Sequence, residues 1–183
     1  MTRVGRLLRE YERYISVPWQ QGLSGAQRVI FVVHDKSAEL HLRTRIEEFE
    51  IATKNAGHGW VLHDLTNSFP KWMANLDYRD NYFDYPEDIE GMMPQFLDYI
   101  VDEIKSVLSG QNIQEDTVLA IMGIACVFGF ARVSEIIHKI APHVRGRLLV
   151  FFPGEYENNN YRLLDARDGW NYLAVPITIP VEC

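Results

Sequence analysis

The chain has 183 residues, of which 47% are hydrophobic and 23% are charged, and these values exclude a disordered, collagen-like or coiled-coil protein. The formal net charge of −7 argues against a nucleic-acid-binding protein, because affinity for phosphate backbones depends on clustered Lys and Arg. This length is enough to bury a sizeable core, so we expect residues 1–183 to form a single domain.

The first half of the chain predicts helices and strands in alternation. Apolar residues recur at helical spacing from Arg3 to Ile15, and the β-branched run from Arg28 to Val33 predicts a first strand. Ser37 is a candidate N-cap for a long helix through about Ala56, which would bury Leu42, Ile46, Phe49 and Thr53 on one face. Residues 60–63 predict a second strand, and residues 69–85 are expected to be irregular or partly helical.

The second half continues the alternation. The pattern predicts a helix from Pro94 to about Leu108, a strand over Thr117–Met122, a helix over Phe130–Ile140 and a strand over Arg147–Phe152. The last strand is expected to end at Pro153-Gly154. A hairpin should then pair Tyr161–Leu164 with Tyr172–Pro176 around Asp168-Gly169.

This order of elements predicts an α/β fold. Continuous apolar strands alternating with amphipathic helices indicate a mostly parallel sheet covered by helices on both faces, with a C-terminal hairpin. Such a core is Rossmann-like or P-loop-like. The Walker A sequence is absent, because the turn after the third strand, residues 123–129, lacks both Lys and a hydroxyl residue.

Other catalytic and cofactor motifs are also absent. The chain has no Gly-x-Gly-x-x-Gly and no Gly-x-Ser-x-Gly, and its two cysteines, Cys126 and Cys183, give neither a disulfide framework nor zinc-ligand spacing. We therefore expect no catalytic residue, cofactor or metal. The absence of a signal peptide or transmembrane segment predicts a cytoplasmic protein.

One alternative ligand site lies at the ends of the first two predicted strands. His34 and Asp35 end one strand, and His63 and Asp64 end the other, so imidazole and carboxylate groups could converge at the carboxyl edge of the sheet. Such groups bind metals or act as acid and base, which would suit a metal- or nucleotide-dependent enzyme or sensor. Alternatively, Asp35 and Asp64 cap the turns that follow them.

The densest polar segment follows the fourth strand. We predict that it forms a surface for a protein partner, because exposed loops that carry amide, carboxylate, guanidinium and phenol groups favour recognition. Mutual salt bridges and turn capping explain the same residues equally well. The candidate residues are Glu155, Tyr156, Asn158, Asn159, Asn160, Tyr161, Arg162, Asp165, Arg167, Asp168 and Trp170.

A second candidate surface spans residues 77–88, where aromatic and acidic residues alternate. This composition suits an interface with a basic partner, but it also suits a surface loop whose rings pack against the core. Four arginines between Arg3 and Arg13 form the one local basic run, which we interpret as the solvated face of a helix.

Six stretches of the sequence carry a resemblance to a known family: residues 14–19, 27–29, 56–60, 64–66, 128–134 and 152–172. The longest reads Phe-Pro-Gly-Glu-Tyr-Glu-Asn-Asn-Asn-Tyr-Arg-Leu-Leu-Asp-Ala-Arg-Asp-Gly-Trp-Asn-Tyr. With these motifs the chain resembles the BrxB family of bacterial BREX phage-defence systems, from about residue 7 to residue 178.

The resemblance implies a component of a multi-protein bacterial system that marks host DNA and blocks phage replication. The other components include a methyltransferase, a large ATPase and PglZ, which is similar to alkaline phosphatases. The family supplies no catalytic residues, so the resemblance favours a non-catalytic adaptor that binds another BREX protein, with PglZ as the expected partner.

Overall fold

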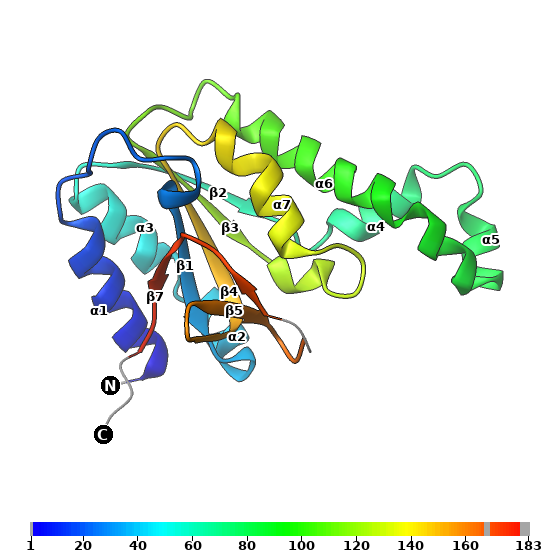
Figure 1. The fold of residues 1–183 in the computed structure, drawn as a ribbon, viewed down its shortest axis with the longest axis horizontal. Helices are drawn as coiled ribbons and strands as arrows, with labels where there is room; N and C mark the ends of the chain where they lie inside the picture. The colour runs from blue at the N-terminus through cyan, green and yellow to red at the C-terminus, as the bar shows by residue number, and fades with distance from the viewer. Residues whose placement is uncertain (1, 167–168, 180–183) are drawn as a thin grey trace.

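A mostly parallel sheet forms the centre of the computed structural model, which describes residues 2–166 and 169–179 (Figure 1). The strand order is β2-β3-β4-β1-β7, and every neighbouring pair in this order is parallel. These strands are β1 (Val29–His34), β2 (Gly59–Asp64), β3 (Thr117–Met122), β4 (Arg147–Glu157) and β7 (Val175–Ile177). The predicted α/β class is confirmed, but the resemblance to a Rossmann or P-loop core is not.

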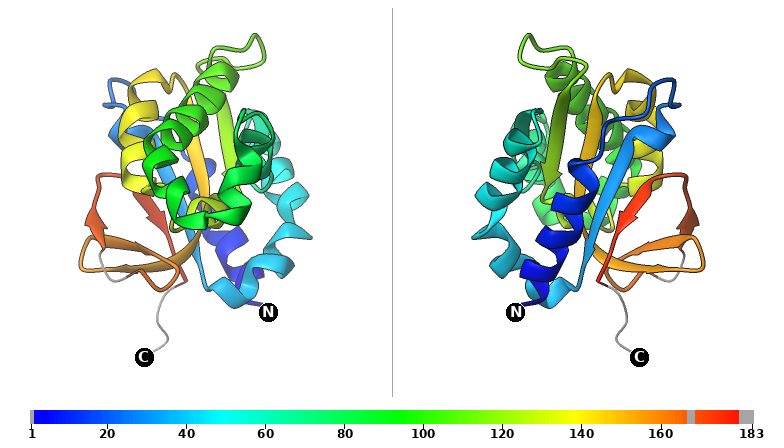
Figure 2. Two further views of the ribbon diagram at one scale, coloured as in Figure 1. Left: turned by 90° about the vertical axis from the view of Figure 1, so that its right-hand side faces the viewer. Right: turned by 90° about the vertical axis from the view of Figure 1, so that its left-hand side faces the viewer.

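Helices cover both faces of the sheet (Figures 1 and 2). One face packs against α6 (Met93–Leu108) and α7 (Val133–Ile140), and the other against α1 (Arg3–Ile15) and α3 (Ile46–Asn55). Each face of the sheet has its own hydrophobic core, and alternate residues of β1 pack into them. Phe31 lies in the core of the first face, and Ile30 and Val32 lie in that of the second. Burial on both sides explains why the strand sequences are continuously apolar.

The predicted long helix after β1 is wrong. Asp35, and not Ser37, supplies the cap, because its Oδ1 accepts a hydrogen bond from the Ser37 amide at 2.8 Å. A 3₁₀ turn (Lys36–Ala38) and a short helix α2 (Glu39–Arg43) precede α3. Thr44 interrupts the helix, since its hydroxyl donates to the His41 carbonyl at 2.8 Å. The predicted apolar stripe is nevertheless buried on both sides of this break.

The fourth strand does not end at Pro153-Gly154, where the sequence predicts its end. Pro153 is the last β4 residue paired with β1, and the strand then continues in a second, antiparallel ladder with β5 (Asn160–Leu163). Gly154 permits this change of partner, because a Cβ atom there would lie 2.1 Å from the Arg162 carbonyl oxygen. One strand therefore belongs to two ladders.

The C-terminal hairpin turns at Asn158-Asn159. Both residues have positive φ values, 50° and 63°, which suit a two-residue hairpin loop whose twist matches its strands. We call residues 154–163 the hairpin. The predicted pairing around Asp168-Gly169 needs correction, because β5 pairs with β6 (Trp170–Asn171), whereas β7 lies parallel to β1. Asp168 lies outside the described residues.

The region from residue 69 to residue 85 is helical in pieces. Helices α4 (Ser68–Ala74) and α5 (Arg79–Asp84) are followed by a 3₁₀ helix, η3 (Pro86–Met92), which runs into α6. Together with the start of α6, α5 and η3 project from the body of the molecule (Figure 1). We call residues 77–92 the arm.

Three further elements were predicted correctly: α1 and β3 over their full lengths, and α6 from one residue earlier. Helix α7 begins at Val133 rather than Phe130, because residues 128–132 form a turn that includes Gly129 at a φ of 82°. The remaining short elements are 3₁₀ turns at Ala26–Arg28, Ile124–Val127 and Ala141–His143. Among the helices that the structure describes, none combines the length and apolar character needed to cross a membrane.

Candidate functional site

The residues of the alternative ligand site do not meet. His34 and Asp35 end β1, and His63 and Asp64 end β2, but β4 and β3 lie between these strands. His63 instead approaches Glu103 of α6, with Nε2 3.2 Å from Oε1. Within residues 2–166 and 169–179, no group of three His, Cys, Asp or Glu side chains is arranged to hold a metal ion.

Asp35 and Asp64 both cap the turns that follow their strands. Hydrogen bonds from Ser37 hold the pKa of Asp35 below its ordinary value. Partial burial opposes ionisation of Asp64, but hydrogen bonds from Thr66 and the charge of Arg43 outweigh it and lower the pKa of this carboxyl as well. The local capping interpretation of these two residues is confirmed.

A chain of polar contacts nevertheless crosses this edge of the sheet. The buried His34 Nε2 lies 2.8 Å from Glu39 Oε2, and Glu39 Oε1 accepts from Arg43 Nε at 2.9 Å. Arg43 continues to the Thr66 hydroxyl at 2.9 Å and to Asp64 at 3.5 Å. Sequence reasoning missed Glu39 and Arg43, although their spacing of four residues on a helix signals an ion pair. These side chains therefore satisfy one another's hydrogen-bonding groups, and their contacts are structural.

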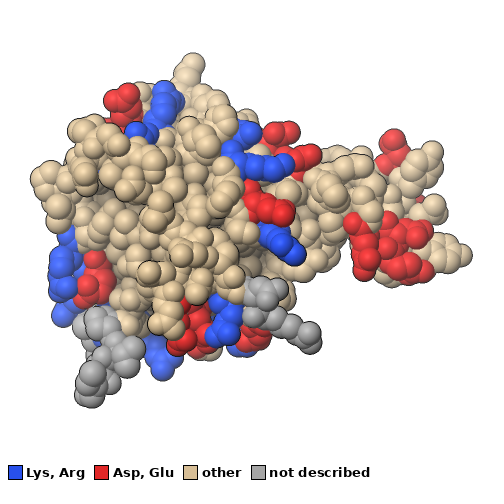
Figure 3. All heavy atoms as spheres, in the orientation of Figure 1, with Lys and Arg blue, Asp and Glu red and all other residues tan. Residues whose placement is uncertain are grey.

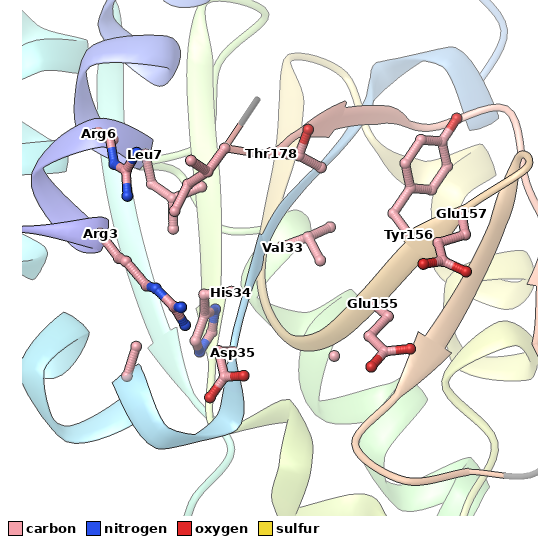
Figure 4. Close-up of a pocket in the computed structure, with 13 residues that line it drawn as sticks. Arg3, Arg6, Leu7, Val33, His34, Asp35, Glu155, Tyr156, Glu157 and Thr178 are labelled. Carbon is pink, nitrogen blue, oxygen red and sulfur yellow. The ribbon is translucent and has the colours of Figure 1, made fainter. Parts of the chain in front are cut away.

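A cleft of about 440 Å³ lies beside the end of β1, between the start of α1 and the hairpin (Figure 4). It brings His34 and Asp35 together with Glu155 and Tyr156, although the sequence assigns these pairs to two separate candidate sites. Arg3 points toward Asp35 from α1 (Figure 4). The cleft therefore has guanidinium groups on one wall and carboxylates on the other.

The predicted partner-binding residues fall into two groups in the structure. Tyr161 is fully buried and its hydroxyl donates to the Ala174 carbonyl at 3.0 Å, so its assignment to an exposed surface was wrong. Trp170 packs edge-on against Phe31 and Phe152. Alternation along a strand explains both positions, since every second side chain faces the core.

The other described candidates lie at the surface. Tyr156 donates to Asn159 Oδ1 at 3.0 Å, Arg162 pairs with Glu155, and Asp165 pairs with Lys36 of the turn after β1. The side chains of Asn158 and Asn160 are exposed. Two further candidates, Arg167 and Asp168, lie outside the described residues.

The arm presents a different surface. Tyr78, Phe83 and Tyr85 are 72%, 71% and 58% exposed, respectively. The arm carries six carboxylates and one guanidinium, Arg79, and Figure 3 shows the acidic side chains gathered at the tip of the projection. Exposed rings among carboxylates form an apolar and acidic surface on an element that stands away from the body.

The comparisons with known proteins agree with the motifs in the sequence. The family model described as "BREX protein BrxB" matches residues 73–177, a segment that contains both the arm and the hairpin. No curated protein matches the chain. No solved structure matches it either. The family model covers more than half of the chain, which therefore belongs to the BrxB family and is a component of a BREX defence system.

Proposed function

We propose that this protein is a non-catalytic adaptor of its BREX system and that the arm is the surface that holds its partner. The observation that carries the proposal is the exposure of Tyr78, Phe83 and Tyr85 on one projecting acidic element. An aromatic ring buries about 150–250 Å² in an interface, and a few such rings usually supply most of the binding energy. The partner that we propose is PglZ.

The base of the arm is anchored firmly enough to present such a surface. Phe69 of α4 stacks on Phe130 with ring centroids 4.2 Å apart, and both rings contact Phe96 of α6. Trp72, which is 5% exposed, packs against the same ring of Phe96. Trp72 is buried at the base and Phe69 and Phe130 are partly buried there, so this packing fixes the point from which the exposed tip projects. A partner that binds a surface held in place in this way loses less conformational entropy.

Co-purification with the other BREX proteins tests this proposal. Tagged wild-type protein should elute with PglZ in size-exclusion chromatography, and the triple variant Tyr78→Ser, Phe83→Ser, Tyr85→Ser should lose the complex while keeping its unfolding midpoint. The matched control is Leu40→Ser with Leu173→Ser, because these side chains are 79% and 69% exposed but lie outside the arm. Failure of the wild type to elute with any BREX protein, or an undiminished complex with the triple variant, refutes the proposal.

A second candidate function is a metal- or nucleotide-dependent enzyme or sensor. The cleft beside β1 favours it, since parallel sheets bind ligands at the carboxyl ends of their strands and the cleft holds Asp35 and Glu155 there. A ligand that binds only the native state must raise its thermal stability. Thermal unfolding with nucleotides and divalent cations should then show a shift that Asp35→Asn with Glu155→Gln abolishes, and unchanged midpoints at saturating ligand would reject this function.

A further inference from the structure

Three arginines gather at the amino-terminal edge of the sheet, opposite the cleft and away from the arm. Arg28 immediately precedes β1, Arg147 is the first residue of β4, and Arg145 lies in the turn before it. Together with Trp19 and Glu115 they line a cavity of about 200 Å³. This concentration of guanidinium groups stands out in a chain whose net charge is −7.

Arg147 is the buried member of this group. Its side chain donates to the Gly146 carbonyl at 3.1 Å and to the Gln20 carbonyl at 3.3 Å, and the residue is only 5% exposed. Its Nε is buried and has no hydrogen-bond partner in the described part of the chain. Burial lowers the pKa of this guanidinium, since taking a cation out of water is unfavourable unless an opposite charge compensates it.

No described residue forms an ion pair with Arg147, although the Tyr14 side chain partly opposes the fall in its pKa. Among the ion pairs of residues 2–166 and 169–179, none involves Arg28, Arg145 or Arg147, although the Glu115 carboxylate lines the same cavity. Arg28 donates to the carbonyls of Val144 and Arg145, at 2.8 Å and 2.9 Å. Carbonyl oxygens bear partial charges only, so the excess positive charge of the cavity remains.

The guanidinium of Arg147 is also held in a fixed position. Its Cζ lies 4.5 Å from the centroid of the Trp19 ring, which itself stacks on His58 at 3.9 Å. A guanidinium oriented in this way is preorganised for an anion, because its N–H groups match the spacing of two oxygens on a phosphate or carboxylate.

We propose that this cavity binds a small oxyanion of the size of phosphate or sulfate, held by Arg147 with Arg28 and Arg145. Pockets that enclose drug-sized ligands usually measure roughly 300–1,000 Å³, so a cavity of about 200 Å³ accommodates the anionic group and no large body attached to it. The anion is either free in solution or the terminal phosphate of a molecule that extends outside.

Binding of inorganic phosphate to the full chain tests the site. Titration calorimetry should detect phosphate binding at constant ionic strength, and sodium phosphate should raise the unfolding midpoint above that in sodium chloride. Arg145→Gln should weaken binding at least tenfold, because it removes one of the three charges from a side chain that is already exposed. Glu115→Gln should strengthen binding, since it removes a carboxylate that lines the cavity.

Arg145 donates to the Ile113 carbonyl at 2.7 Å. Arg79→Gln is the matched control, because Arg79 is likewise exposed and donates to a backbone carbonyl, that of Ala74. It should bind phosphate like the wild type. Equal affinities for Arg145→Gln and Arg79→Gln, or no phosphate binding by the wild type, would overturn the site and leave Arg147 with a structural role in holding the Gln20 carbonyl and the Trp19 ring.

A nucleoside monophosphate distinguishes the two sources of the anion. If the nucleotide binds more tightly than inorganic phosphate and Arg145→Gln loses this binding, the site holds the phosphate end of a larger molecule. Equal or weaker binding of the nucleotide assigns it to the free anion. Both outcomes retain the oxyanion site, and neither depends on the partner that the arm holds.

Discussion

The hairpin and the arm have similar compositions but differ in how deeply their aromatic side chains are buried. Both segments mix tyrosines with carboxylates and amides, but Tyr161 of the hairpin is completely buried, whereas Tyr78 of the arm is 72% exposed. The hairpin is built of paired strands whose alternation sends every second residue into the core. The arm is built of short helical pieces, on which Tyr82 packs against the core while its neighbour Phe83 is 71% exposed. Aromatic content alone therefore does not identify a binding surface.

The largest effect expected from this difference is on stability. Replacing Tyr161 by Ala should lower the free energy of unfolding by about 3–5 kcal/mol, because it empties a buried ring site and leaves the Ala174 carbonyl without its donor. Tyr78→Ala in the arm should change it by less than about 0.5 kcal/mol. Urea unfolding of both variants measures the contrast, and equal losses would remove the distinction between the two regions.

Glycine substitutions test the same difference between the hairpin and the arm, here through the space around the backbone. Gly154→Ala should destabilise the protein by about 3 kcal/mol, because the new Cβ would meet both the Arg162 carbonyl oxygen and the Phe152 ring. At Gly91 of the arm a Cβ would have no atom within 4 Å, so Gly91→Ala should leave stability unchanged or raise it by up to about 1 kcal/mol. Thermal unfolding of the pair is the measurement, and a tolerated Gly154→Ala would mean that the hairpin is packed loosely.

The turn of the hairpin gives a smaller effect. Asn159→Ala should lower the free energy of unfolding by about 1 kcal/mol, since alanine is disfavoured at a φ of 63° and the Tyr156 hydroxyl loses its acceptor. Asn159→Gly tolerates this φ and should recover most of that loss. Denaturation combined with PglZ co-elution separates two roles of the turn: a weakened complex with Asn159→Gly, at full stability, would add the hairpin to the partner surface.

The smallest effect concerns pH and lies outside both regions, at Glu39. The hydrogen bond with His34 is the main reason that the pKa of Glu39 is below its ordinary value of 4.5, with Arg43 contributing in the same direction. A carboxyl whose pKa is lower in the folded state contributes stability above pH 4.5, and this contribution disappears as the pH falls through the folded pKa.

Glu39→Gln should therefore be less stable than the wild type near pH 7, and the difference should shrink toward pH 3. Asp88→Asn, at an exposed position in the arm, should give a curve parallel to that of the wild type. Urea midpoints measured across this pH range provide the comparison. A constant difference between Glu39→Gln and the wild type would exclude the ionisation of Glu39 as its cause.

Periodicity and composition predicted β3, α1 and α6 well, because the apolar pattern of each element continues without a break over its whole length. They failed where one residue decides the geometry. Thr44 ends a helix whose apolar stripe continues beyond it, and Pro153 and Gly154, usual breakers of strands, allow β4 to change partners.

The candidate sites were predicted less completely, because their residues come from distant elements. The position of β3 and β4 between the ends of β1 and β2 separates His34 from His63, and no local pattern specifies the strand order. The exposure of Tyr78 and the burial of Tyr161 depend likewise on tertiary packing. The arginine cavity joins residues 28, 145 and 147, which lie together because β1 pairs with β4.

The position of β1 between β4 and β7 has a consequence for the order of folding. Ile30 pairs with Leu149 on one side and with Val175 on the other, so both neighbours of this strand are made long after it during synthesis. Contacts so distant along the chain slow folding, because a large loop must close before they form. Until then β1 presents two unpaired, apolar edges, which makes the nascent chain vulnerable to aggregation. Completion of the sheet thus depends on β4 and β7, which are synthesised long after β1.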